Sequence, residues 1–321
     1  MALNFPKILL LGSVGLFVVI GITATFKKIT TNRASVPVAI PSQPTPEIKP
    51  LTVSTPLLQD GDDLPQVDRV EQLFTTGPNK LPIVETVVYE STVPWMKGRP
   101  AWIGDYASYY ATSRHFIARS MNGRVDYFAQ KVLPGCRFNV FRKDKNLQFY
   151  LLADLSKCKM AFYYVDLDSN ERVLLKSYKI GLGKKNDAPS GSLTPLGKFL
   201  LGDKIAVYRP GIMGLFHDKQ VEMIKVFGTR WIPFGKELGK TTAPSKGLGI
   251  HGVPWDFDQK SNRWIEARHL VGTYESDGCL RMAFEDMEEL FSIVITKPTV
   301  IEIVKNFKEA QLPGVEVKSP K

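Results

Sequence analysis

The sequence has no long run of charge of one sign and no recognisable nucleic-acid-binding motif. Its formal net charge is +10, from 42 Lys and Arg against 32 Asp and Glu, yet no basic run exceeds two residues. It contains neither a zinc finger nor an RNP-type aromatic stripe. A basic surface attracts several kinds of anionic partner, so the charge selects none of them, and the missing motifs argue against nucleic acid.

Cysteine is scarce, and the chain has three: Cys136, Cys158 and Cys279. Outside the cytoplasm an odd number suggests one disulfide and one working thiol, or no disulfide at all. We favour a disulfide between Cys136 and Cys158 that leaves Cys279 free. That the two upstream cysteines are simply buried thiols is an equally open alternative.

A long uncharged run occurs at residues 8–26, between Lys7 and Lys27. As a helix it would span roughly 28 Å at about 1.5 Å per residue, enough for a bilayer core. A cleaved signal peptide would need small residues one and three positions before the cut, and Ile22-Thr23-Ala24 supplies only the nearer one. The sequence therefore predicts an uncleaved membrane anchor within residues 1–28. The proline-rich residues 29–66 that follow are typical of a semi-extended tether.

The rest of the chain has the composition of a globular protein, with 44% hydrophobic and 23% charged residues overall. Residues 67–157 predict a small α+β region of unknown role, with helices at 67–74 and 102–121, a strand at 83–89, and a hairpin of strands 138–141 and 147–152. Its aromatic residues could form a glycan-binding surface, although core packing is the commoner role. Candidate core positions in the second helix are Trp102, Tyr106, Tyr109, Tyr110, Phe116, Ile117 and Met121.

Residues 158–306 predict a mostly β domain, sandwich-like or barrel-like, with one late helix at 284–294 and a C-terminal tail at 307–321. The turn residues Asp168-Ser169-Asn170 separate two strand patterns and indicate a hairpin. The expected strands are 161–167, 172–181, 199–201, 221–227, 249–251 and 300–304.

Two phosphate-binding patterns can be excluded. Residues 247–252 spell G-x-G-x-x-G, but Pro254 follows and no helix opens there, as a dinucleotide fingerprint requires. Residues 191–198 resemble a P-loop, but five residues instead of four separate its glycines, and Phe199 stands where Ser or Thr would bind magnesium. Neither pattern predicts a nucleotide site.

The pattern most suggestive of chemistry is His251-Gly252 followed by Ser276-Asp277-Gly278-Cys279-Leu280-Arg281. Cysteine attacks as a thiolate and needs a nearby base or a positive environment. His251 ends an apolar strand, and Gly278 permits a tight turn that would free backbone N–H groups for an oxyanion. Local chemistry alone leaves open an inert Cys279 beside a core histidine.

Residues from about 159 to 304 resemble the L,D-transpeptidase catalytic domain, also called the YkuD domain. The family signature is a histidine followed by a small residue, a gap, and then Ser/Thr-His-Gly-Cys with a following Arg or Asn. Four matching segments occur in the family's order: Thr194 to Phe199, Trp231 to Phe234, Gly249 to Gly252, and Ser276 to Arg281. Residues before about 135 have no such match.

The resemblance implies that Cys279 is the nucleophile and His251 its base. Gly252 would supply a backbone carbonyl that orients the imidazole, and N–H groups at Gly278 and Cys279 would face the oxyanion. The remaining implied site residues are Ser276, which would organise the turn, and Arg281, Asp277 and Trp231, which would contact substrate.

The chain departs from the family pattern in two places. Asp277 stands where the family has a second histidine, and its carboxylate would raise the pKa of the thiol unless it pairs with Arg281, as we expect. The gap of 24 residues between His251 and Ser276 exceeds the family's, so the added loop is either a lid over the substrate or a plain surface insertion. His269, in this loop, is a less favoured substitute for the missing histidine.

The resemblance further implies acyl transfer within peptidoglycan. Cys279 would attack the third-residue carbonyl of a tetrapeptide stem, expel the terminal D-alanine, and pass the acyl group to an amine of a neighbouring stem. Thiol, base and oxyanion donors suffice, so no metal or organic cofactor is expected. Carbapenem-type β-lactams are the expected inhibitors. A thiol carboxypeptidase, an enzyme that attaches envelope proteins, and an inactive envelope-binding module stay open as alternatives.

Such a substrate lies outside the cytoplasm, so we expect residues 8–26 to hold the catalytic domain on the periplasmic side of the cytoplasmic membrane. Lys27, Lys28 and Arg33, after the apolar run, slightly favour the opposite orientation. The sequence does not resolve that conflict.

Overall fold

The computed structural model describes residues 53–54, 67–122 and 132–318. The predicted anchor at 8–26 lies outside the described residues, as does the predicted tether except for residues 53–54. Within the described part, no helix is both long and apolar enough to cross a membrane. Every element below belongs to the unit that runs from Lys49 to Lys321.

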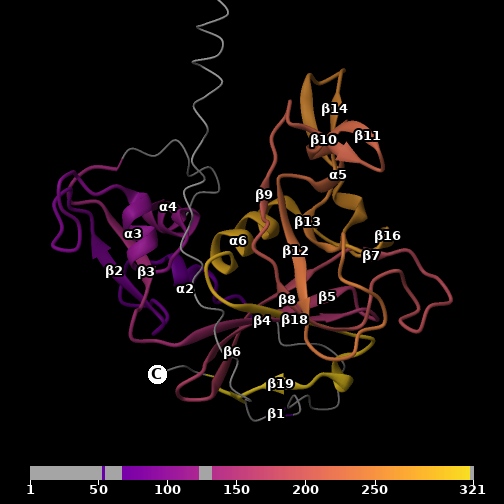
Figure 1. The fold of residues 1–321 in the computed structure, drawn as a ribbon, viewed down its shortest axis with the longest axis horizontal. Helices are drawn as coiled ribbons and strands as arrows, with labels where there is room; N and C mark the ends of the chain where they lie inside the picture. The colour runs from indigo at the N-terminus through magenta and orange to yellow at the C-terminus, as the bar shows by residue number, and fades with distance from the viewer. Residues whose placement is uncertain (1–52, 55–66, 123–131, 319–321) are drawn as a thin grey trace, which may run out of the picture. The chain divides into compact units, whose positions relative to one another are not determined.

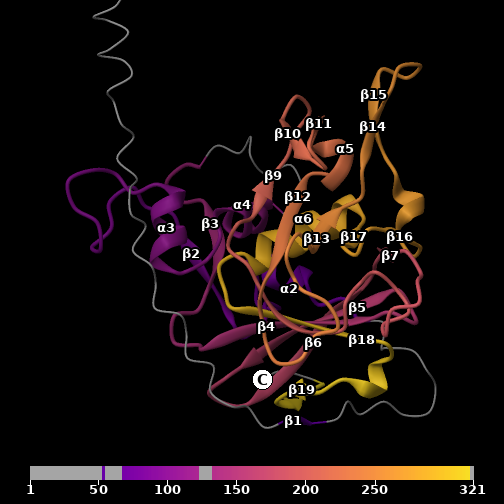
Figure 2. The same ribbon diagram turned by 45° about the vertical axis from the view of Figure 1, so that its right-hand side comes forward.

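The described chain is mostly β, as predicted, and is built on one ten-stranded mixed sheet. In Figures 1 and 2 strand β12 runs steeply while β4 and β5 lie nearly flat, so the sheet twists strongly along its width. From one edge to the other its strands are β17 (Leu280–Met282), β13 (Gly249–Gly252), β12 (Arg230–Glu237), β8 (Gly197–Leu201), β18 (Thr299–Val304), β4 (Leu147–Asp154), β5 (Lys159–Asp166), β6 (Glu171–Lys179) and β20 (Val315–Glu316), with β9 (Ala206–Val207) also paired to β12.

Strands β4 and β18 pair in parallel at the middle of the sheet, and every residue of both is buried. Continuous burial is typical of a strand whose two faces are both covered. Because side chains alternate between faces, Phe149 and Leu151 of β4 join one core, and Tyr150 and Leu152 join another. The sheet is thus the middle layer of the domain.

Helix α6 (Phe284–Val294) covers the first of these faces, and its position along the chain confirms the helical spacing seen in the sequence. Leu290 and Phe291 are fully buried in the core that includes β12 and β13 residues. The C-terminal segment covers the opposite face through Phe307 and Leu312. It contains a 3-10 helix, η2 (Phe307–Glu309), and strand β19 (Leu312–Pro313), which pairs with β1 (Val53–Ser54), so the expected tail is packed as far as residue 316.

The N-terminal region forms a small layer of helices on a two-stranded sheet, β2 (Val84–Val88) with β3 (Arg137–Phe141). The single helix predicted at 102–121 is two helices that separate near Ala111, whose φ is 44°. Trp102 is 69% exposed and Tyr109 38% exposed, so neither is a core residue, whereas Tyr106, Phe116 and Ile117 are. The helices are α2 (Glu71–Phe74), α3 (Ile103–Tyr109) and α4 (Arg114–Asn122).

The predicted hairpin of strands 138–141 and 147–152 is wrong. β3 pairs with β2, whereas β4 pairs with β5 on one side and β18 on the other. The turn residues between β3 and β4 are compatible with a hairpin, but the apolar β4 buries both of its faces only in the middle of the large sheet. By contrast, the predicted hairpin around Asn170 is confirmed by the antiparallel pairing of β5 with β6.

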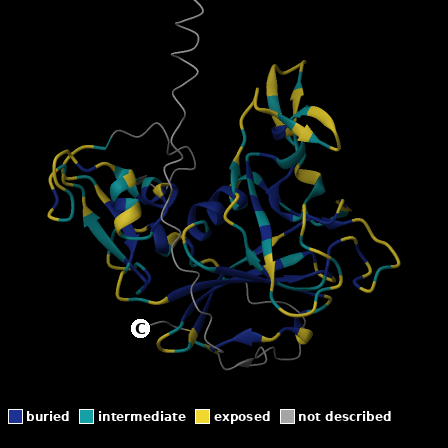
Figure 3. Ribbon diagram, viewed as in Figure 1, coloured by how far each residue is buried: buried dark blue, intermediate teal, exposed yellow. Residues whose placement is uncertain are grey.

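The strand predicted at 221–227 is also wrong. β11 (Lys219–Glu222) pairs with β10 (Met213–Phe216) in a hairpin, and the chain then turns into a short helix, α5 (Ile224–Phe227). A second hairpin consists of β14 (Trp255–Asp258) and β15 (Arg263–Glu266). Figure 3 shows both hairpins largely exposed or half-exposed, in contrast to the buried central strands.

The predicted disulfide between Cys136 and Cys158 is wrong, because both cysteines are free. Cys136 precedes β3, where its sulfur accepts the backbone N–H of Leu133. Cys158 lies in the turn between β4 and β5 with a φ of 50°. The two thiols therefore belong to separate parts of the fold. The odd number of cysteines in the sequence was not a sign of a disulfide.

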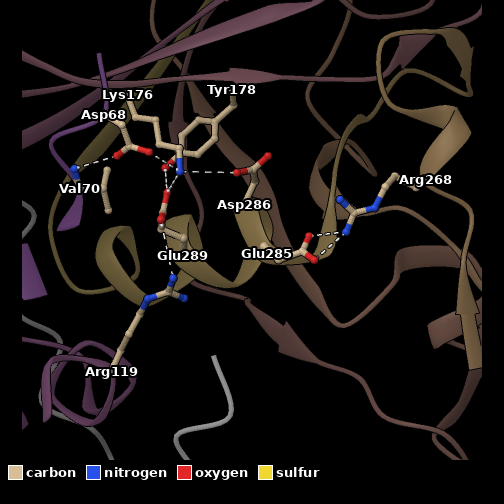
Figure 4. Close-up of polar contacts among 9 residues, drawn as sticks. All are labelled: Asp68, Val70, Arg119, Lys176, Tyr178, Arg268, Glu285, Asp286 and Glu289. Carbon is tan, nitrogen blue, oxygen red and sulfur yellow. Dashed lines mark hydrogen bonds and ion pairs between the residues drawn. The ribbon is translucent and has the colours of Figure 1, made fainter. Parts of the chain in front are cut away.

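A buried ionic cluster joins the N-terminal region to α6 and β6 (Figure 4). Glu289 of α6 accepts hydrogen bonds from Lys176 and from the hydroxyl of Tyr178, both at 2.9 Å, and forms an ion pair with Arg119 of α4 at 3.7 Å. Lys176 also pairs with Asp68 at 3.1 Å. Burial raises the pKa of Glu289, and its cationic neighbours oppose that shift.

We expect Glu289→Ala to lower the free energy of unfolding by about 3–5 kcal/mol, because it leaves the buried Arg119 without its carboxylate and removes one of the ion pairs of Lys176. Glu285→Ala is a matched control on the same helix, since the Glu285–Arg268 pair in Figure 4 is more than half exposed and should change stability by no more than about 1 kcal/mol. Urea unfolding monitored by circular dichroism measures both values. Equal shifts in the two variants would contradict the role given to the buried cluster.

Candidate active site

The site begins with the parallel pairing of β13 and β17 at one edge of the sheet. Their register sets Ile250 opposite Leu280 and His251 opposite Arg281. Because neighbouring residues on paired strands share a face and side chains alternate along each strand, His251 and Arg281 point to the same side. Cys279, two positions before Arg281, points there too.

These side chains line a cavity of about 490 Å³, called here the Cys279 cavity. Its remaining walls come from Tyr208, from Phe227 at the end of α5, and from the β10–β11 hairpin. The predicted site residues that the fold brings together around it are Cys279, His251, Arg281, Ser276, Asp277 and Trp231.

His251 is held in one orientation by its own strand. Its Nδ1 lies 2.7 Å from the carbonyl oxygen of Gly252, as expected, so the proton sits on Nδ1 and Nε2 keeps its lone pair. The ring packs edge-on against Phe227 with centroids 5.2 Å apart. Burial, together with a smaller contribution from the charge of Arg281, lowers the pKa of His251 to about 4, and the hydrogen bond with Gly252 opposes this shift. At neutral pH the imidazole is therefore a neutral base.

Gly228 allows Phe227 to pack in this way. It ends α5 with a φ of 62°, and a Cβ there would lie 2.6 Å from the Val253 carbonyl oxygen and 2.9 Å from Cα of Gly252. Only a glycine fits a left-handed backbone at such close approach. The turn after α5 is thereby brought against the end of β13.

The Cys279 thiol is 9% exposed and donates a long hydrogen bond, 3.9 Å, to the carbonyl oxygen of Gly247. Burial raises the pKa of the thiol to about 11; a hydrogen bond with the Gly249 backbone and the charge of Arg281 oppose the rise, and Asp277 adds to it. The resting pair is thus a neutral thiol and a neutral imidazole. For the imidazole to accept the thiol proton, that proton would have to turn from Gly247 to His251, and resting sites commonly hold such contacts loosely.

Ser276 organises the turn that carries the thiol. Its Oγ donates to the carbonyl oxygen of Cys279 at 2.7 Å and accepts the N–H of Gly278 at 3.2 Å. Gly278 has a φ of 118°, and a Cβ there would lie 2.9 Å from the Leu193 carbonyl oxygen. The N–H of Gly278 is therefore engaged by Ser276, contrary to the expected pair of oxyanion donors. Within the described part of the chain, the N–H of Cys279 has no acceptor, so it is the donor available to an oxyanion.

The segment around Thr194 supports this turn from behind. Thr194 is fully buried, and its Oγ1 accepts the N–H of Gly183 at 2.8 Å. Gly183 belongs to β7 (Leu182–Gly183), which pairs in parallel with β16 (Tyr274–Ser276), the strand that leads into the turn. A Cβ on Gly183 would lie 2.9 Å from Cα of Gly278. Distant segments of the sequence pattern thus meet around one turn.

The sequence led us to expect an ion pair between Asp277 and Arg281, and that expectation is wrong. The ion-pair partner of Asp277 is Lys184, at 3.1 Å, and both side chains are more than half exposed. The register of β17 places the Arg281 side chain inside the cavity, whereas Asp277 lies at its open side. The buried Nε of Arg281 has no hydrogen-bond partner among the described residues.

Sequence reasoning missed the β10–β11 hairpin, which contributes Leu215, Phe216 and His217 to the cavity. The turn residues His217 and Asp218 both have positive φ, but they lack the Asn-Gly signature that marks such a turn in a sequence. His269, the less favoured substitute for the family's second histidine, is exposed in the 3-10 helix η1 (Arg268–Leu270) and does not line the cavity. Across the residues the structure describes, no cluster of His, Cys, Asp and Glu could hold a metal ion.

A family model described as the L,D-transpeptidase catalytic domain, YkuD, matches residues 148–303. Residues 148–303 belong to the YkuD family. Among solved structures, Bd1075 of Bdellovibrio bacteriovorus is 16% identical, with 49% of this chain and 48% of that chain covered and a TM-score of 0.32. The helical cell shape determining protein Pgp2 of Campylobacter jejuni is 17% identical, with 51% and 52% covered and the same TM-score.

The match thus spans about half the length of each of these two proteins. A search of curated proteins finds no match. The YkuD match begins within β4 and ends within β18, so it contains every residue that lines the Cys279 cavity.

In this YkuD domain, Asp277→Asn should make alkylation of Cys279 by iodoacetamide faster at a given pH. Removing the carboxylate lowers the thiol pKa from about 11, so the thiolate fraction rises, by roughly threefold for an exposed charge nearby. Lys184→Gln should have the opposite effect, since it leaves Asp277 without its cation. Mass spectrometry of Cys279 alkylation between pH 7 and 10 measures the rates. Superimposable profiles for all three proteins would rule out this electrostatic role of Asp277.

Proposed function

We propose that this protein is a peptidoglycan L,D-transpeptidase that forms a thioacyl intermediate on Cys279 with His251 as base. The observation that carries the proposal is the placement of His251 on β13 and of Cys279 directly before the neighbouring strand β17, around one cavity, with Nδ1 of His251 fixed by Gly252. The YkuD match supplies the substrate class, since that family acts on peptidoglycan peptides.

In the proposed reaction, Nε2 of His251 takes the thiol proton as the sulfur of Cys279 attacks the third-residue carbonyl of a tetrapeptide stem. The Cys279 N–H stabilises the oxyanion. Collapse of the tetrahedral intermediate breaks the peptide bond, and the imidazolium gives its proton to the departing amine of D-alanine. An amine of a neighbouring stem then attacks the thioester, loses a proton to His251, and releases the thiol with a new amide cross-link.

Arg281 is the residue we assign to a substrate carboxylate. Its guanidinium borders the cavity that holds the thiol, and its Nε is unpartnered among described residues. A tetrapeptide ends in a carboxylate one residue beyond the attacked carbonyl, so a cation beside the thiol would fix the register of the substrate. Trp231, whose strand position is opposite His251, would bound the stem on the other side.

The same proposal places the enzyme in the cell envelope. Residues 8–26 would anchor it in the cytoplasmic membrane with the catalytic domain on the periplasmic side, and carbapenem-type β-lactams would acylate Cys279. With water as acceptor the same intermediate would give carboxypeptidase activity, and with a protein lysine it would attach an envelope protein.

Incubating the purified full-length protein with disaccharide tetrapeptides should yield cross-linked dimers together with free D-alanine, resolved by mass spectrometry. Cys279→Ala should abolish both products and the thioacyl adduct, whereas Cys136→Ser, a change at a half-buried cysteine outside the cavity, should retain them. Tripeptide without dimer would identify water as the acceptor. Intact substrate together with an unreactive Cys279 would leave only an envelope-binding module.

A further inference from the structure

A second cavity, of about 560 Å³, adjoins the Cys279 cavity. Trp255 and Trp264 of the β14–β15 hairpin, Phe284 at the start of α6, and Tyr208 line it, and we call it the tryptophan cavity. Tyr208 lines both cavities, and its ring stacks on Phe227 with centroids 6.0 Å apart. The two spaces therefore meet at the side chain of Tyr208.

The walls of the tryptophan cavity are half-exposed aromatic rings held in place by their neighbours. Trp255 packs edge-on against Phe284 with centroids 5.3 Å apart, and Trp264 contacts Phe257 at 5.7 Å. In the described structure, the indole N–H groups of Trp255 and Trp264 and the hydroxyl of Tyr208 make no hydrogen bond. The cavity thus offers flat apolar faces with polar groups at their edges, ready for a ligand.

The charges at the floor of this cavity are already matched. Arg230 and Glu288 form an ion pair at 2.7 Å, with both side chains more than nine-tenths buried, and Thr229 donates to Glu288 at 2.6 Å. The first N–H of α6, at Phe284, is taken by Glu266 at 2.6 Å. Because these opposite charges neutralise each other, the floor offers no net charge to an anion or a cation, and the other charged residue of the lining, Arg209, lies at the exposed rim. The ligand that fits is neutral, with an apolar face and polar edges.

We propose that the tryptophan cavity binds an N-acetylated amino sugar of the glycan strand. The sugar's ring face and acetyl methyl would pack on the indoles, and its hydroxyl and amide groups would bond to their N–H groups and to Tyr208. This inference rests on the proposed function, because a stem peptide is attached to such a sugar. A peptide that reaches Cys279 then brings its sugar to the adjoining space. The longer loop between His251 and Ser276 thereby forms a wall of a sugar site.

The direct test measures binding of the peptide-free disaccharide of N-acetylglucosamine and N-acetylmuramic acid to the full-length protein by calorimetry. Trp264→Ala and Trp255→Ala should each weaken binding about tenfold, the scale of one lost aromatic contact. Ile265→Ala removes a half-exposed apolar side chain beside Trp264 on β15 that does not line the tryptophan cavity, and it should leave binding unchanged. An unchanged rate of Cys279 alkylation shows that each variant is folded around the thiol.

The second test compares two substrates. In the Trp264→Ala enzyme, KM for the disaccharide tetrapeptide should rise about tenfold while KM for the free tetrapeptide stays constant. Trp264→Phe keeps an aromatic ring but loses the indole N–H. Its KM for the disaccharide tetrapeptide should lie between those of the wild type and the alanine variant.

The outcomes separate this inference from the proposed function. Absence of disaccharide binding overturns the sugar site while leaving catalysis by Cys279 intact. An equal rise in KM for both substrates in the tryptophan variants has the same meaning. Disaccharide binding that depends on both tryptophans supports the site even if Cys279 proves inert, in which case only the proposed function fails.

Discussion

The parallel pairing of β13 with β17 is the constraint on which the rest of the site depends. It joins segments about 30 positions apart and sets His251 and Arg281 side by side. Parallel neighbours cannot be linked by a tight turn, so the chain must leave the sheet and return. Here the returning segment contains the β14–β15 hairpin. One topological requirement therefore aligns His251 with the turn that carries the Cys279 thiol and also supplies the two tryptophans of the adjoining cavity.

Burial is what gives the two reactive side chains their resting state. It disfavours the charged form of each group, which lowers the pKa of His251 and raises that of Cys279. A neutral imidazole with a free Nε2 can accept a proton, whereas an imidazolium could not. Because the thiol pKa is raised, only a small fraction of the resting molecules carries the thiolate. The charges of Arg281 and Asp277 change that fraction, since Arg281 lowers the thiol pKa and Asp277 raises it.

Helix α6 connects the site with the N-terminal region. Two adjacent carboxylates on it reach different partners, because successive helical residues point about 100° apart. Glu288 pairs with Arg230 beneath the tryptophan cavity, and Glu289 joins the cluster with Lys176 and Arg119. The same helix thus fixes the floor of one cavity and the packing of α4. The N-terminal region shares the core beneath the ten-stranded sheet through Phe74 and Phe116.

The sequence by itself determined the mostly β class, the hairpin around Asn170, helix α6, the YkuD resemblance and six of the residues that line the Cys279 cavity. Each of these rests on periodicity or on residues close together in a motif. Only the tertiary structure decided that β4 leaves β3 for the centre of the sheet, that Asp277 pairs with Lys184, that Ser276 occupies the Gly278 N–H, and that Tyr208 and the β10–β11 hairpin complete the cavity. These features depend on strand register and on contacts between distant segments, and local sequence patterns specify neither.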